Sequence, residues 1–186
     1  MRTIFMLALL ALFAVSCENN DNTSLDNAPF DDVIADFDVK EMDQAQFETA
    51  LTTEVLSMNK VVIYTKEQGW GALIDGGTFG WIGLLCNTDG TSRYVFELQP
   101  TGQYEGIRCV NGKWSYNQAT QEFTIHSSQN YKIRAKVIYY RHPRVILEGR
   151  KEAYKSYRFR WDCVFGEMDA EELLASCTDF VSYETE

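Results

Sequence analysis

The side chains best suited to acid–base chemistry are two histidines and four carboxylates on predicted strands. Paired carboxylates act as acid and base in glycoside hydrolysis. The four are Glu97, Glu105, Glu148 and Asp162. Their spacing selects no two of them as a pair. His126 and His142 belong to no H-E-x-x-H motif, and there is no Cys-x-x-Cys, no G-x-S-x-G and no phosphate-binding glycine loop leading into a helix. We therefore expect a protein that is not an enzyme and needs no metal or other cofactor.

Cys17 has chemistry of another kind, because it directly follows a small-residue cleavage motif that ends at Ser16. The apolar run from Ile4 to Val15 is too short to span a bilayer. This arrangement looks like a bacterial lipoprotein signal, in which the cysteine becomes the lipidated first residue. Ordinary signal-peptide cleavage at the same bond is the alternative. We expect residues 1–16 to be a signal peptide, 17–29 a lipidated tether, and 30–186 a single domain.

The other four cysteines are an even number, as in exported proteins whose thiols pair. They are Cys86, Cys109, Cys163 and Cys177. Three connectivities are possible. Cys163 and Cys177 are close in sequence, so a bridge between them would pin the last helix to the last strand and leave Cys86 with Cys109. Four buried free thiols are the alternative.

Cations follow three consecutive predicted strands near the end of the chain. They should form one patch on the face opposite the aromatic side chains, where a glycan, a lipid headgroup or an acidic protein surface can bind. A solvated outer face neutralised by the chain's own acidic segments is the simpler interpretation, and we favour it. The net charge of −10 argues against a nucleic-acid partner. The cations are Lys132, Arg134, Lys136, Arg141, Arg144, Arg150, Lys151, Lys155, Arg158 and Arg160.

The elements that position these side chains are mostly strands. Apolar residues alternate with polar ones in segments about ten residues apart, separated by turn signals. Asn111-Gly112 is the strongest of these signals and predicts a type I′ hairpin, with Trp114 buried in the core after it. The pattern predicts a mainly β, antiparallel up-and-down barrel of about eight strands. A short N-terminal helix capped by Asp43 should cover one end or edge of it, and a short C-terminal helix should close the chain.

Three motifs of the central region resemble the pattern of small lipocalin-like lipoproteins of Bacteroidota. They are Gly102-Gln103-Tyr104, the stretch from Asn111 to Tyr116, and Phe123-Thr124-Ile125. The resemblance covers roughly residues 60–165. It implies a lipocalin-like barrel in an outer-membrane lipoprotein that faces the periplasm or the cell surface. It implies no particular substrate.

Aromatic side chains that share the inward faces of the predicted strands are candidates for holding a ligand. An apolar interior with a few hydroxyl and indole donors suits a small apolar or amphipathic molecule. The alternative is a structural or protein-interaction lipoprotein, because an eight-stranded barrel is narrow enough for its own side chains to fill. The candidates are Tyr94, Phe96, Trp114, Tyr131, Tyr157, Phe159 and Trp161.

Overall fold

The computed structural model describes residues 28–71, 81–98, 106–128, 131–175, 177 and 180–181. Cys17, the predicted signal peptide and nearly all of the predicted tether lie outside these residues, as do Glu105 and the first motif of the resemblance. Within the described part of the chain, no helix is both long and apolar enough to cross a bilayer.

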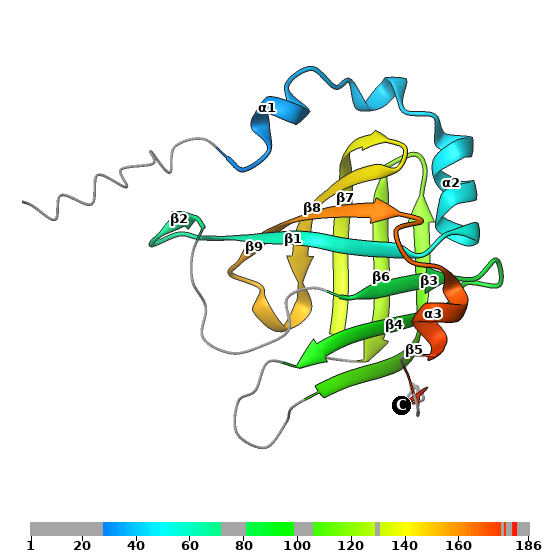
Figure 1. Cartoon of the computed structure of the whole chain (residues 1–186). Helices are drawn as coiled ribbons and strands as arrows, with labels where there is room; N and C mark the ends of the chain where they lie inside the picture. The colour runs from blue at the N-terminus through cyan, green and yellow to red at the C-terminus, as the bar shows by residue number, and fades with distance from the viewer. Residues whose placement is uncertain are drawn as a thin grey trace, which may run out of the picture.

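Eight antiparallel strands close into a barrel, as the sequence predicts (Figure 1). Consecutive barrel strands are hydrogen-bonded neighbours, and β9 returns to pair with β1, so the order is up-and-down. The strands are β1 (Leu56–Thr65), β3 (Gly83–Cys86), β4 (Thr91–Leu98), β5 (Gly106–Asn117), β6 (Glu122–Ser128), β7 (Tyr131–Arg141), β8 (Arg144–Lys151) and β9 (Arg158–Phe165). Two short strands lie outside this path: β2 (Gly69–Trp70) pairs with β1, and β10 (Phe180–Val181) pairs in parallel with β5.

The predicted hairpin at Asn111-Gly112 is wrong, because both residues lie inside β5. Asn111 is opposite Arg93 and Gly112 is opposite Ser92, so the ladder with β4 continues through them. At Lys113 the strand pairs with β4 on one edge and with β6 on the other. The pairing of Asn111 and Gly112 with β4, continued by β6 from Lys113 onward, outweighs the local turn preference of the dipeptide.

Helix α2 (Gln44–Thr53) begins at its predicted cap, where the Asp43 carboxylate accepts a hydrogen bond of 2.9 Å from the Gln46 amide. The helix buries Phe47, Ala50 and Leu51 against the core and covers one end of the barrel (Figure 1). Two shorter elements precede it, α1 (Asp31–Ile34) and η1 (Val39–Glu41). The N-terminal helical segment is therefore confirmed, and its role is to close one barrel end.

Helix α3 (Ala170–Ala175) lies on the outer face of β3, β4 and β5 rather than inside the barrel. Its Leu173 is buried with Val95 and Cys109 in a cluster separate from the barrel interior. A Cβ added to Gly83 would collide with the end of the Leu173 side chain. A glycine at this position of β3 therefore lets the helix approach the sheet closely.

Candidate ligand site in the barrel interior

Four of the seven predicted ligand-binding residues lie together in the barrel interior. Tyr94, Phe96, Phe159 and Trp161 are buried in one cluster with the rest of the core. Phe159 and Trp161 stack with ring centroids 5.3 Å apart, and Tyr94 and Phe96 are 5.3 Å apart on the opposite wall. The alternation of these two strands predicted both pairs, because side chains two residues apart point to the same face.

The remaining three candidates are not buried in this interior cluster within the part of the chain that the structure describes. Trp114 and Tyr157 are half-buried and pack against the edge of the same cluster. Trp114 was predicted to be buried, but its indole reaches the turn after β3, where Nε1 donates to the Asn87 carbonyl at 2.8 Å. Tyr131 is the first residue of β7, and its side chain lies outside the described part of the chain. A role for any of the seven in ligand binding remains a prediction.

Trp81 joins the two walls and was not among the predicted ligand-binding residues. Its ring stacks on Trp161 at 6.3 Å and lies 6.0 Å from Tyr94, while its Nε1 donates to the Leu56 carbonyl at 2.8 Å. Trp161 and Phe159 are 0% exposed, so no water contacts them. The described middle of the barrel is therefore filled by its own rings, and a ligand would have to lie nearer an end.

Lys151 is the unexpected polar side chain of the interior. It is 1% exposed and lies opposite Ile133, in the inward row of β8 that also holds Val145 and Leu147. Burial lowers the pKa of its ammonium to about 8. Lys151 was predicted to belong to the outer cationic patch, which is wrong. Parity with Val145 and Leu147 would have identified it as inward-facing.

Lys151 lies at the end of the barrel opposite α2. Two stacked tyrosines lie at the same end. The Lys151 Nζ lies 5.9 Å from the centre of the Tyr154 ring, within the range of a cation–π contact. Tyr154, the last residue of η2 (Glu152–Tyr154), stacks on Tyr157 at 5.9 Å, and both rings are half-buried against the core. The end of the barrel thus combines a buried cation, two phenol rings and an apolar wall that contains Ile63 and Phe159.

Two of the four carboxylates considered for acid–base chemistry, Glu148 and Asp162, form ion pairs on the outer face. Glu148 bonds Arg158 and Arg160, and Arg144 donates to both oxygens of Asp162 at 2.7 and 2.9 Å. Burial raises the pKa of Glu148, but the hydrogen bonds from Arg158 and Arg160 outweigh it, and the pKa lies below its ordinary value. Arg160 also binds Asp31 of α1 at 2.9 Å. The chain's own acids thus neutralise part of the predicted cationic patch.

The disulfide differs from the bridge between Cys163 and Cys177 that the sequence analysis considered. Cys109 and Cys177 form the disulfide, while Cys86 and Cys163 are buried free thiols. The reason is the path of the C-terminus: after α3 the chain crosses to β5, where Phe180 pairs opposite Cys109. Cys163 instead faces the barrel interior with Trp161 and Phe165. Burial raises the pKa of both free thiols well above its ordinary value.

The histidines are placed apart, one on β6 and one in the turn after β7. His126 is half-buried, and burial together with Lys132 and Lys113 lowers its pKa. His142 is exposed and its Nε2 lies 3.0 Å from Glu54 Oε1. In the described ranges, no three His, Cys, Asp or Glu side chains come together as a metal site would require.

Comparison with known proteins found no matching family model and no matching curated protein. Several solved structures resemble the chain at low identity. A deswapped triple mutant of bovine odorant-binding protein is 12% identical, covers 68% of this chain and 82% of its own length, and has a TM-score of 0.42. The odorant-binding protein from bovine nasal mucosa is 11% identical, covers 68% and 77%, and has a TM-score of 0.44. Its complex with undecanal is 11% identical, covers 63% and 73%, and has a TM-score of 0.42.

Proposed function

We propose that this chain is an exported binding module that holds a small amphipathic anion at the barrel end opposite α2. The observation that carries the proposal is Lys151, a lysine 1% exposed on the inward face of an otherwise apolar wall. Charged side chains are very rarely buried this deeply, because transfer from water is costly. A lysine here gives the interior a positive charge that an anionic headgroup can meet.

The surroundings of Lys151 favour a headgroup attached to an apolar tail. The rings of Tyr154, Tyr157 and Phe159 provide apolar surface, and the two phenol hydroxyls provide hydrogen bonds. Pockets of this composition bind a ligand by burial and orient it by a few polar contacts. A fatty-acid-like carboxylate is therefore the ligand class that we expect, ahead of uncharged odorant-like or sterol-like molecules.

Tryptophan fluorescence tests the proposal with matched ligands at pH 7. Decanoate should quench saturably and bind at least about tenfold more tightly than decanol, because a hydrogen bond to a charged group contributes about 1.5–3 kcal/mol. Lys151→Met should abolish this preference, whereas Lys132→Met, on the outward face of β7, should keep it. Sterols and bile-salt-like amphiphiles extend the panel. Absence of saturable quenching by every member would refute the proposal.

A filled barrel that serves as an interaction module of the cell envelope is the second candidate. It is favoured by the stacking of Trp81, Trp161 and Phe159, which leaves no water-accessible surface on the last two. On this account no ligand binds, and Lys151→Met only stabilises the fold by removing a buried charge. The same titration therefore separates the two candidates.

The location proposed for the protein is the outer membrane, through a lipid on Cys17, which lies outside the described residues. Small residues before the cysteine and a polar stretch after it support this anchor. Cys17→Ser should move the protein from the membrane fraction to the soluble fraction of the periplasm. A protein found soluble with Cys17 intact would contradict lipidation but not export.

A further inference from the structure

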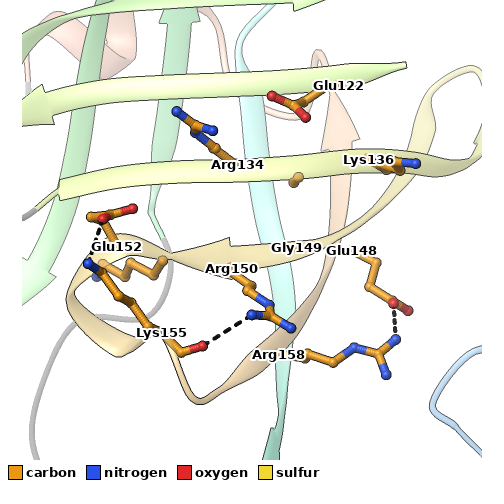
Figure 2. Close-up of a pocket in the computed structure, with 11 residues that line it drawn as sticks. Glu122, Arg134, Lys136, Glu148, Gly149, Arg150, Glu152, Lys155 and Arg158 are labelled. Carbon is orange, nitrogen blue, oxygen red and sulfur yellow. Dashed lines mark hydrogen bonds and ion pairs between the residues drawn. The ribbon is translucent and has the colours of Figure 1, made fainter. Parts of the chain in front are cut away.

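A groove of about 540 Å³ lies on the outer face of the barrel, between β7, β8 and the η2 segment (Figure 2). Outward residues of the strands make up most of its lining, and the inward-row residues Ala135, Gly149 and Lys151 also reach it. Figure 2 shows Arg134 on β7, Arg150 on β8 and Arg158 at the start of β9 among the side chains of the groove. Lys136 and Lys155 complete the outward cations.

Two neighbouring rows of side chains on this face differ in net charge. One row combines a cation with two acids, and the other places two cations opposite each other. In one row, Lys136 of β7 lies between Glu122 of β6 and Glu148 of β8, so a cation has an acid on each side. In the next row, Arg134 lies directly opposite Arg150. Like charges directly opposite each other destabilise a sheet. The second row therefore carries a repulsion that an anion between the two guanidinium groups would remove.

Two of the acids that line the groove form ion pairs with cations other than Arg134 and Arg150. Glu148 bonds Arg158 and Arg160, and Glu152 forms an ion pair with Lys155 at 3.0 Å. Arg150 donates only to the Lys155 carbonyl, at 3.5 Å, and Arg134 forms no ion pair with any residue that the structure describes. The hydrogen bond from Lys155 lowers the pKa of Glu152, and the charge of Arg134 contributes to this shift, but the Glu152 side chain is half-exposed, so water screens its interaction with Arg134. The Arg134–Arg150 row thus remains positive.

We propose that this groove binds a phosphate group between Arg134 and Arg150. A guanidinium presents a planar fork of donors that matches phosphate oxygens, and two such forks suit a dianion better than a carboxylate with a single charge. A phosphate monoester carries about −1.5 to −2 at neutral pH, which balances the two arginines. The phosphate can belong to a soluble ester or to the headgroup of a lipid. Lys151 also lines the groove, but Arg134 and Arg150 belong to the outward row of β7 and β8. The inference therefore does not require the interior ligand, and its test uses the two arginines alone.

Thermal unfolding of the full chain tests the site, with inorganic phosphate compared against chloride at equal ionic strength. Phosphate should raise Tm by at least about 2 °C in the wild type, since a ligand that binds only the folded state stabilises it. Arg134→Gln and Arg150→Gln should each lose most of this shift. Lys113→Gln, which removes an exposed cation on β5, should keep it. General salting-out by phosphate raises Tm equally in all four proteins, so the difference between variants is the readout.

A second arm uses phosphatidylcholine vesicles with and without phosphatidic acid. A Tm shift with inorganic phosphate that depends on both arginines supports a site for soluble phosphate esters. A dependence on both arginines seen only with phosphatidic acid vesicles supports a lipid headgroup. Equal responses of the two arginine variants, the Lys113→Gln control and the wild type in both arms would overturn the proposal.

Discussion

The ring of Phe47 on α2 meets the ring of Phe165, the last residue of β9, edge to face, with centroids 6.0 Å apart. Phe47 also lies 5.0 Å from Tyr140 at the end of β7, in a similar geometry. A single helical side chain thus joins the ends of two strands that are not neighbours. This contact explains how a helix of ten residues closes a barrel end.

Replacing Phe47 with alanine should lower the free energy of unfolding by about 3–5 kcal/mol, as is typical for a phenylalanine lost from a packed core. Urea denaturation measures the loss. Glu48→Ala, an exposed position on the same helix, should change stability by no more than about 0.5 kcal/mol. Similar values for the two variants would show that α2 does not hold the barrel end closed.

The depressed pKa of Lys151 predicts a pH dependence of stability. Between about pH 8 and 10.5 the unfolded chain holds this proton and the folded chain releases it, so raising the pH stabilises the folded state through Lys151. The buried thiols Cys86 and Cys163, whose pKa values are raised, act in the opposite direction above about pH 8.5. Lys151→Met is the appropriate reference because both proteins contain those thiols.

The wild type should therefore gain about 1–2 kcal/mol relative to Lys151→Met from pH 8 to about 9.5. Burial raises the pKa of Tyr140 to about 12, which lowers stability above about pH 10, but both proteins contain Tyr140 and its effect cancels in the difference. Lys132→Met provides the matched control and should run parallel to the wild type. A constant difference between the wild type and Lys151→Met across this range would mean that Lys151 is not buried.

Gly149 on β8 leaves no room for a side chain. An added Cβ would overlap the Arg134 carbonyl oxygen and lie 2.5 Å from the Ala135 Cα, both on β7. Gly149→Ala must push these strands apart, and we expect it to cost about 1–3 kcal/mol of unfolding free energy. Ser115→Ala, at an exposed position of β5, should be nearly neutral. An unchanged urea midpoint for Gly149→Ala would show that β7 and β8 are not this close.

The disulfide between Cys109 and Cys177 should stabilise the fold by constraining the unfolded chain. It spans 68 residues, for which the chain-entropy model gives about 4 kcal/mol. A thiol reductant should lower Tm of the wild type but not of the Cys109→Ala/Cys177→Ala variant. Cys86 and Cys163 are free thiols, so reduction should not act through them. Equal reductant sensitivity of both proteins would contradict this pairing.

Local patterns predicted the fold and the inward faces well. The alternation in β4 and β9 is a period of two residues, and it placed Tyr94, Phe96, Phe159 and Trp161 in one interior. The Asp43 cap likewise depends on a residue only three positions away. Such features are readable because the residues that decide them are close in sequence.

The features that the sequence analysis missed depend on partners far along the chain. Asn111-Gly112 became part of a strand because it pairs with β4, and the same strand continues from Lys113 into its pairing with β6. The pairing of Cys109 with Cys177 follows from the crossing of the C-terminus to β5, which no local pattern encodes. Lys151 is different. The alternation of β8 indicates that it faces inward, but the prediction followed the general rule that lysines lie on the outer face.

The covalent ring from Cys109 to Cys177 divides the molecule into two parts that respond differently to mechanical force. The ring encloses most of β5 and all of β6 to β9, whereas β1 to β4 precede it. Tension applied at the N-terminal side would peel β1 from β3 and β9 and extend the chain only as far as Cys109. The chain inside the ring, about 230 Å in contour length, could not extend until the disulfide is reduced. A chain held at its N-terminal side would therefore lose its barrel under load yet keep a looped remnant that contains most of β5 and all of β6 to β9.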